Sequence, residues 1–278
     1  MIDESLITDH YSHGRLLDDI EAGLTTLGKS PRTAEVDDLA PVDEFHIGGR
    51  LATEAFLDQL DIGPGDHVLD VGCGLGGASR FAVERYGCRV TGVDLSEEYV
   101  EVGTVLNSWV GLAGRVRLEA ADASDTPYPD AEFDKAYMLH VGMNIPDKIA
   151  LATELHRVLT PGGVLGVYDV MRVGEGELDF PVPWASTPDA SAVARPEDYR
   201  RALAQSGLRV TAERNRAAFA ERFFTDLQAA AAGAAGPPPL GIHLLMGETA
   251  ATKVANMIEN IAKGRIAPVE LVAVKTGH

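Results

Sequence analysis

The chain has 278 residues, of which 45% are hydrophobic, so it can bury the core of one large α/β domain with added elements. Its 24 basic and 42 acidic side chains give a formal net charge of −18. This charge argues against a nucleic acid or an anionic membrane surface as a partner, because both repel a polyanion. A cationic or zwitterionic ligand is compatible with the same charge.

Two cysteines, Cys73 and Cys88, are too few for a disulfide framework, which favours a reducing compartment. The first residues include acidic side chains and no long apolar run, unlike a signal peptide. No window of the sequence has the length and apolar character of a transmembrane helix. We therefore expect a cytoplasmic protein.

The first third of the chain predicts two helices separated by a loop. Leucine and isoleucine recur at helical spacing over 15–27, and Gly28 ends that pattern. Residues 29–44 are polar and contain two prolines, so we expect a loop there. A second helix is expected over 50–60, ahead of a Gly-Pro-Gly turn.

From residue 67 onward, short apolar runs alternate with helical patterns. Strands are expected over 67–72, 88–94, 115–122, 132–140 and 162–170. A helix is expected to precede the last of these strands, over 146–159. This alternation predicts a parallel, doubly wound sheet.

From residue 173 onward, the regular alternation of strands and helices ends. Residues 173–195 contain three prolines, two glycines and Trp184. Helices are then expected over 196–205, 217–232 and 247–264, and strands over 208–215 and 267–276. We expect inserts that cap a substrate site at about 173–195 and 217–263.

A glycine-rich turn follows the strand at 67–72. Glycines at this point let the backbone turn sharply and approach a ligand, and the next helix offers free N–H groups at its N-terminus. Gly72, Gly74 and Gly77 also fit the dinucleotide fingerprint, with Asp94 as the ribose acid, so an NAD-dependent oxidoreductase is an alternative. Asp70 argues against it. A carboxylate there repels a pyrophosphate and suits the cationic groups of S-adenosylmethionine.

Five segments together resemble the class I S-adenosylmethionine-dependent methyltransferases. They are D-V-G-C-G-L-G-G at 70–77, Asp94, A-D-A at 121–123, F-D-K-A-Y-M-L-H at 133–140 and L-H-R-V-L-T-P-G-G at 155–163. The resemblance covers 48–276 and implies a seven-stranded Rossmann-like sheet whose final strand is antiparallel. It also implies S-adenosylmethionine as cofactor and S-adenosylhomocysteine as product.

A further motif, E-F-H-I-G-G at 44–49, resembles the lid motif of small-molecule methyltransferases. The sarcosine/dimethylglycine N-methyltransferases have such a motif, as do sugar and tocopherol methyltransferases of natural-product pathways. The resemblance implies a helical N-terminal lid over 1–47 and a methyltransferase domain over 48–276.

The resemblance implies a set of cofactor-binding residues. Asp70 and the glycine loop would hold the methionine moiety, Asp94 the ribose hydroxyls, and Leu95 the adenine ring. For Asp122, a loop-capping role is the alternative to binding the adenine amino group. The complete set is Asp70, Gly72, Cys73, Gly74, Gly76, Asp94, Leu95, Asp122, Ala123 and His140.

His140 and His46 are the candidate catalytic residues. His140 follows the strand at 132–140, at the carboxyl edge where ligands bind in open α/β sheets. It could orient the cofactor, contact substrate or act as a base, or it could only bind backbone. Trp184 either closes the pocket or anchors its loop in a core. The candidate substrate-binding residues are Tyr11, His46, Gly48, Met143, Asn144, Tyr168 and Trp184.

The expected function is in-line methyl transfer to a small molecule, with N-methylation of a small amine or amino acid as one option. C- or O-methylation in secondary metabolism is the alternative. A methyltransferase fold that performs no transfer is a further alternative. The histidines and cysteines lack metal-ligand spacing, so we expect no metal. Both a monomer and a homo-oligomer are compatible with the sequence.

Overall fold

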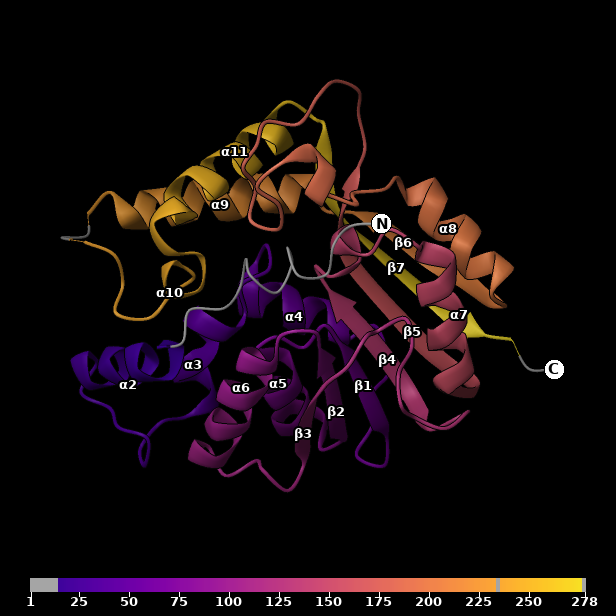
Figure 1. Cartoon of the computed structure of the whole chain (residues 1–278), viewed down its shortest axis with the longest axis horizontal. Coiled ribbons are helices and arrows are strands. Elements are labelled where there is room, and N and C mark those ends of the chain that lie inside the picture. Colours follow the sequence, from indigo (N-terminus) through magenta and orange to yellow (C-terminus); the bar gives the residue numbers. More distant parts are fainter. Residues whose placement is uncertain (1–14, 234–235, 277–278) are drawn as a thin grey trace.

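The computed structural model describes residues 15–233 and 236–276. Its centre is a seven-stranded sheet with the order β3-β2-β1-β4-β5-β7-β6 (Figure 1). The strands are β1 (His67–Val71), β2 (Arg89–Asp94), β3 (Val116–Ala120), β4 (Phe133–Leu139), β5 (Leu159–Arg172), β6 (Leu208–Asn215) and β7 (Ile266–Lys275). Strands β1 to β5 pair in parallel, and β7 pairs antiparallel with both β5 and β6. The predicted doubly wound sheet with an antiparallel last strand is confirmed.

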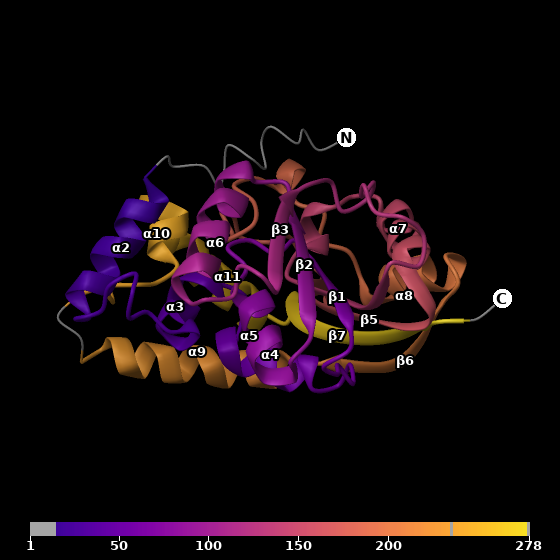
Figure 2. The same cartoon turned by 90° about the horizontal axis from the view of Figure 1, so that it is seen from below.

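Helices cover both faces of this sheet and its carboxyl edge (Figures 1 and 2). They are α2 (Leu16–Thr26), α3 (Val36–Asp43), α4 (Gly49–Leu57), α5 (Gly77–Tyr86), α6 (Glu97–Trp109), α7 (Lys148–Val158), α8 (Pro196–Gln205), α9 (Ala217–Ala231), α10 (His243–Met246) and α11 (Ala250–Ala262). Short 3₁₀ turns lie at Gly142–Asn144, Pro188–Ala190 and Gly247–Thr249.

The alternation of side chains along each strand divides the core into two layers. Val68 belongs to the layer packed against α4 and α5, and its neighbour Leu69 belongs to the layer packed against α7 and α8. Tyr168 on β5 lies in the first layer, so Asp169 extends to the opposite face. Because both faces are covered by helices, the parallel strands are apolar along most of their length.

The expected loop at 29–44 contains a helix, α3. Asp38 accepts a hydrogen bond from the Glu35 N–H at 2.8 Å, and the two residues form a capping box. The side chains of Val36, Leu39 and Val42 are buried at helical spacing. The prolines and acidic residues of this stretch concealed that short apolar pattern.

Helices α9 and α11 form a cap above the carboxyl edge of the parallel strands. In Figure 1, α9 and α11 run together over this edge. The cap shares an apolar cluster with Ile47 of the 44–49 motif, Met143 after β4 and Val170 on β5. Phe224 of α9 and Met257 of α11 belong to the same cluster. The cap thus packs on the carboxyl end of β5 and on the segment after β4, at the edge of the sheet where ligands usually bind in such folds.

Candidate functional site

The glycine loop after β1 packs against neighbours that leave no room for side chains. Gly72 has a φ of +67°, and a Cβ there would meet a methyl group of Val141 at 2.3 Å. A Cβ on Gly74, which has a φ of +52°, would meet the Phe45 ring at 3.2 Å. The loop is therefore enclosed by the residue after His140 on one side and by the 44–49 motif on the other.

Asp94 at the end of β2 binds this loop directly. Its Oδ2 accepts a hydrogen bond from the Gly74 N–H at 2.8 Å, and its Oδ1 accepts one from the Ser96 N–H at 3.0 Å. Burial raises the pKa of Asp94, while the hydrogen bonds from the N–H groups of Ser96 and Gly74 lower it. Each carboxylate oxygen has a second lone pair, so the group can also accept ribose hydroxyls. Ser96 caps α6 by accepting a hydrogen bond from the Tyr99 N–H with its Oγ.

Asp70 lies beneath the glycine loop. Its Oδ2 accepts hydrogen bonds from the Ser79 hydroxyl at 2.6 Å and the Tyr137 hydroxyl at 3.0 Å. Burial raises its pKa to about 7. These bonds join the end of β1 to α5 and β4, so the carboxyl group supports the loop that we expect to hold the cofactor.

The remaining predicted cofactor residues lie along the same edge. The Ala121 N–H donates to the Asp94 carbonyl at 3.0 Å, which places Asp122 and Ala123 next to the end of β2. The Asp122 carboxylate accepts from the Ser124 N–H at 2.7 Å. This contact agrees with the loop-capping alternative, and its other lone pairs leave the binding role possible.

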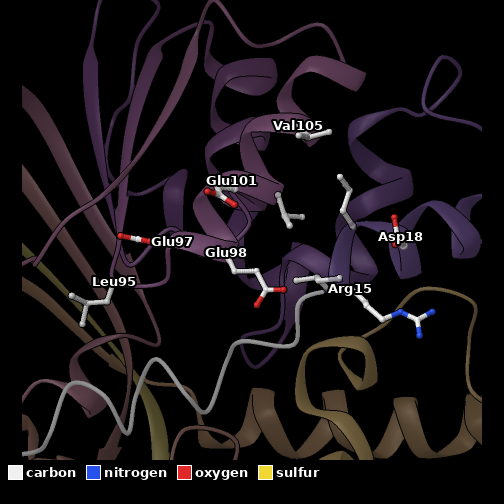
Figure 3. Close-up of a pocket in the computed structure, with 10 residues that line it drawn as sticks. Arg15, Asp18, Leu95, Glu97, Glu98, Glu101 and Val105 are labelled. Atoms are coloured by element: carbon white, nitrogen blue, oxygen red, sulfur yellow. The ribbon is translucent and has the colours of Figure 1, made fainter.

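A cavity of about 760 Å³ lies between α2 and α6, and Leu95 lines one end of it. Figure 3 shows Arg15, the N-cap of α2, and Asp18 of α2 at the far end of the cavity, with Glu98 and Glu101 of α6 between this end and Leu95. The cavity therefore begins beside the proposed adenine position.

His140 occupies a strained position after β4. Its φ of +56° is uncommon for a residue with a side chain. Its N–H donates to the Tyr168 carbonyl at 2.7 Å, which helps hold that conformation. Its Nδ1 accepts from the Ile47 N–H at 3.5 Å, so the proton of the neutral ring is on Nε2. Within the described part of the chain, that buried Nε2 has no hydrogen-bond partner.

His46 lies beside His140, with ring centroids 5.9 Å apart. Burial lowers the pKa of His46 to about 4 and the pKa of His140 well below its ordinary value. Both rings are thus neutral at pH 7. The Tyr168 ring is 5.0 Å from that of His140, and its hydroxyl donates to the Ile47 carbonyl at 2.9 Å. The two candidate catalytic histidines and Tyr168 therefore form one cluster.

The other predicted substrate residues surround this cluster or belong to the cap. A Cβ on Gly48 would meet the Phe219 ring of α9 at 2.5 Å, so the 44–49 motif contacts the cap. Met143 is buried with cap residues, and the Oδ1 of Asn144 has no partner among the residues that the structure describes. Trp184 is 4% exposed and donates to the Ser191 hydroxyl at 3.0 Å, which agrees with the core alternative. Tyr11 lies outside the described residues.

The Cys73 thiol does not have the character of a nucleophile. It is buried in the glycine loop, and burial raises its pKa well above its usual range. Over residues 15–233 and 236–276, no group of three histidine, cysteine or acidic side chains could hold a metal ion. In the same residues, no helix is long and apolar enough to cross a membrane.

Two further residues shape the site: Asp169, near the end of the strand expected over 162–170, and Tyr199, which sequence reasoning missed. Asp169 accepts hydrogen bonds from the Tyr199 hydroxyl at 2.5 Å and from the Val170 N–H at 2.9 Å. A Cβ on Gly142 would meet the Asp169 carboxylate at 2.5 Å, so Asp169 supports the turn that carries Met143. Its place at the end of an expected strand was the available signal. The partner Tyr199, on α8, has no local signal.

Comparisons with known proteins identify the class. Residues 68–163 match the family model described as "Methyltransferase domain". The chain is 34% identical over 142 residues to Methyltransferase GfsG of Streptomyces halstedii, covering 51% of this chain and 50% of that protein. It is 38% identical over 125 residues to Phosphoethanolamine N-methyltransferase 3 of Arabidopsis thaliana, covering 45% of this chain and 25% of that protein. The chain thus spans half or less of the length of these curated relatives.

Solved structures show the same fold. Geranyl diphosphate C-methyltransferase from Streptomyces coelicolor A3(2), in complex with S-adenosyl-L-homocysteine, has a TM-score of 0.65 at 23% identity, over 81% of this chain and 75% of that chain. The [4+2]-cyclase SpnF has a TM-score of 0.66 at 21% identity, over 95% of both chains.

Residues 68–163 therefore resemble a methyltransferase domain both in sequence and in fold. The predicted resemblance to S-adenosylmethionine-dependent methyltransferases of small molecules is confirmed.

Proposed function

We propose that the protein transfers a methyl group from S-adenosylmethionine to a small molecule by in-line displacement. The observation that carries the proposal is the Asp94 carboxylate bound to the Gly74 N–H, within the segment that matches a methyltransferase domain. The same match argues against the NAD-dependent oxidoreductase that the glycine spacing had left open.

The residues at the carboxyl edge fit this cofactor. Asp94 would accept ribose hydroxyls with its unused lone pairs, and Leu95 would pack against adenine. Asp122 and Ala123 would bind the adenine edge. Gly72, Cys73, Gly74 and Gly76, supported by Asp70, would enclose the methionine moiety. When bound, the cofactor supplies an electrophilic methyl group on a sulfonium.

The histidine cluster would hold the methyl acceptor. In its neutral form His140 presents an Nε2–H as a donor. His46, also neutral, can accept a proton or a hydrogen bond from the substrate. Methyl transfer depends chiefly on holding the two reactants in line, and the 44–49 motif and the cap would exclude water from the site.

The class of nucleophile decides how much the histidines contribute. An amine needs only a deprotonated lone pair, so for N-methylation of an amine or amino acid they would orient the substrate. A hydroxyl or carbon nucleophile needs a proton acceptor, and for C- or O-methylation one of them would act as the base. The free, buried cysteines at 73 and 88 are compatible with a cytoplasmic enzyme, which we also propose.

Mass spectrometry tests the proposal. Purified protein would be incubated with methyl-deuterated S-adenosylmethionine and a pooled metabolite extract that includes glycine, sarcosine and dimethylglycine. We expect one labelled product, and its structure identifies the methylated atom. Calorimetry with S-adenosylhomocysteine accompanies the screen. An absence of binding would refute the proposal, whereas binding without any labelled product would favour a methyltransferase fold that performs no transfer.

A further inference from the structure

A buried polar network lies behind His46 and has no place in the function proposed above. Thr53, on α4, places its Oγ1 3.0 Å from the His46 Nε2 and 2.5 Å from the Oε2 of Glu44. Thr53 is 0% exposed and Glu44 is 4% exposed. Glu44 is the C-cap residue of α3, so the network joins the start of the 44–49 motif to the helix that follows it.

Arg50 completes the network on the side away from His46. Its Nε contacts the Oε1 of Glu44, and its Nη1 lies 2.9 Å from the Asp37 carboxylate. Burial is the main reason that the pKa of Glu44 rises to about 7, while Arg50 and the Thr53 hydroxyl oppose that rise. The carboxylate form therefore becomes dominant as the pH rises above 7. Taking a carboxylate out of water is costly, and a charged partner on one side offsets part of that cost.

The geometry fixes the direction of each hydrogen bond. The Thr53 hydroxyl has one proton, and the Glu44 carboxylate at 2.5 Å is a stronger acceptor than the Gly49 carbonyl at 3.5 Å. Toward His46 the hydroxyl therefore accepts. The Gly49 carbonyl, 3.1 Å from the same Nε2, can only accept. Both contacts place the proton of the neutral His46 ring on Nε2, which leaves Nδ1 with a lone pair.

We propose that Glu44 and Thr53 are positioning residues that, together with the Gly49 carbonyl, hold His46 in its Nε2–H form, so that Nδ1 takes the proton of the methyl acceptor. This inference rests on the proposed methyl transfer. The arrangement assigns complementary roles to the two histidines, because His140 then offers a donor N–H and His46 offers an acceptor nitrogen.

In the proposed methyl transfer, one bond to the methyl carbon forms while another breaks. A lone pair of the acceptor atom forms the bond to the methyl carbon, and the carbon–sulfur bond breaks with its electron pair going to sulfur. The proton of the acceptor atom moves to Nδ1 of His46, which becomes an imidazolium. Its Nε2–H remains hydrogen-bonded to Thr53, and the negative charge of Glu44 beyond it stabilises the new positive charge. This is the role that a buried acid has behind a histidine base in hydrolases.

The side chains around His46 come from several elements, and Glu44 is the acidic one among those described below. His140 after β4 and Tyr168 on β5 are neutral neighbours, with ring centroids 5.9 Å and 6.2 Å from that of His46. Arg50 on α4 lowers the pKa of His46. Glu44 is thus the acidic side chain that the described contacts bring behind the imidazole, through Thr53.

Nitrogen NMR of protein labelled with ¹⁵N-histidine tests the tautomer without any substrate. His46 would be assigned by comparison with His46→Gln. In the wild type we expect a neutral ring with its proton on Nε2. In Thr53→Val, which keeps the shape of the side chain and removes the hydroxyl, the Gly49 carbonyl still accepts from Nε2–H, so we expect the tautomer to stay and the Nε2 signal to shift as this nitrogen loses one of its two acceptors. A wild-type ring that carries its proton on Nδ1, or an Nε2 signal that is unchanged in Thr53→Val, would overturn the inference.

Turnover of the acceptor that the labelling screen identifies gives the second measurement. We expect Thr53→Val and Glu44→Gln to lower kcat at least about tenfold, the scale of a weakened acid–base step. Affinity for S-adenosylhomocysteine should stay within about twofold, because the hydrogen bonds of Thr53 go to Glu44, His46 and Gly49 and the proposed cofactor residues lie elsewhere. Thr53→Ser, which restores the hydroxyl, should recover most of the turnover.

A matched control distinguishes the loss of the relay, meaning the hydrogen bonds from Glu44 through Thr53 to His46, from the effect of removing any partly buried hydroxyl. Thr91 on β2 lies 2.9 Å from the Nε2 of His67, a partly buried threonine–histidine pair at the amino end of β1. Thr91→Val removes that bond far from the site, so kcat should not change. An equal loss of kcat in Thr91→Val and Thr53→Val would show that the relay has no specific role. If Thr53→Val fails to fold, Glu44→Gln and the wild-type tautomer still decide the question. If no acceptor is methylated, the proposed function fails while the tautomer can still be measured.

Discussion

Asp70 shows how a single buried side chain makes the stability of this protein depend on pH. The group is 2% exposed, and burial raises its pKa to about 7, against about 3.9 for a free aspartate. Between these values the folded state binds a proton that the unfolded chain has released. Folding is therefore favoured at low pH, and the contribution of Asp70 to stability is lost as the pH rises through about 7.

We predict that Asp70→Asn becomes more stable relative to the wild type as the pH rises. Asparagine keeps an oxygen that can accept from Ser79 and Tyr137 and has no charge to bury. From about pH 5.5 to about pH 8 the difference in the free energy of unfolding should shift by about 2 kcal/mol in favour of the variant. Urea denaturation at the two pH values measures it. A difference that stays constant would mean that Asp70 titrates near its ordinary value.

At the scale of elements, the 44–49 motif connects three parts of the fold. Ile47 binds Tyr168 of β5 and His140 after β4 through its backbone, while Gly48 contacts Phe219 of α9. Gly48 has a φ of +96° and is the N-cap of α4. Only glycine adopts that conformation freely and allows the Phe219 ring so close to the backbone. The motif therefore sets the distance between the sheet edge and the cap.

We predict that Gly48→Ala destabilises the protein more than Gly28→Ala does. Gly28 also has a positive φ, of +74°, but nothing lies within 4 Å of a Cβ there, so its substitution costs only backbone strain of about 1–2 kcal/mol. Gly48→Ala adds the clash with Phe219 and should also loosen α9. Urea denaturation gives the two costs, and limited proteolysis reports on α9. Equal costs would show that the Phe219 contact contributes nothing.

At the scale of the whole molecule, the sequence predicted what depends on contiguous residues. The strands, the glycine loop and Asp94 are encoded in short runs whose spacing reflects the geometry of a parallel sheet. The helix α3 was missed because Pro41 and five acidic residues at 35, 37, 38, 43 and 44 accompany only three buried apolar ones. The relay from Glu44 through Thr53 to His46 could not be predicted, because its hydrogen bonds form only after α3 and α4 pack.

The cap illustrates the same limit. Its helices were predicted in nearly the right places, but the sequence did not indicate that Phe219 contacts Gly48, and it left open whether Trp184 closes the pocket or packs in a core. Such contacts join segments that are far apart in the chain. The residues that would select the methyl acceptor come from these segments, whereas those that would hold the cofactor come from the contiguous motifs.

Cofactor binding should stabilise the whole molecule, because the glycine loop, the end of β2 and the 44–49 motif are parts of one folded unit. At a concentration of 100 times its Kd, S-adenosylhomocysteine should raise the free energy of unfolding by about 2.7 kcal/mol. Asp94→Ala removes a charged acceptor, which should weaken binding by about 1.5–3 kcal/mol and abolish about half of this gain or more at the same concentration. Ser96→Ala, which removes the α6 cap hydroxyl and leaves Asp94 in place, is the control and should keep the gain. Thermal denaturation with and without ligand measures both. Stabilisation by NADH in place of S-adenosylhomocysteine would contradict the assignment, because the Asp94 carboxylate would then be holding the ribose of a dinucleotide.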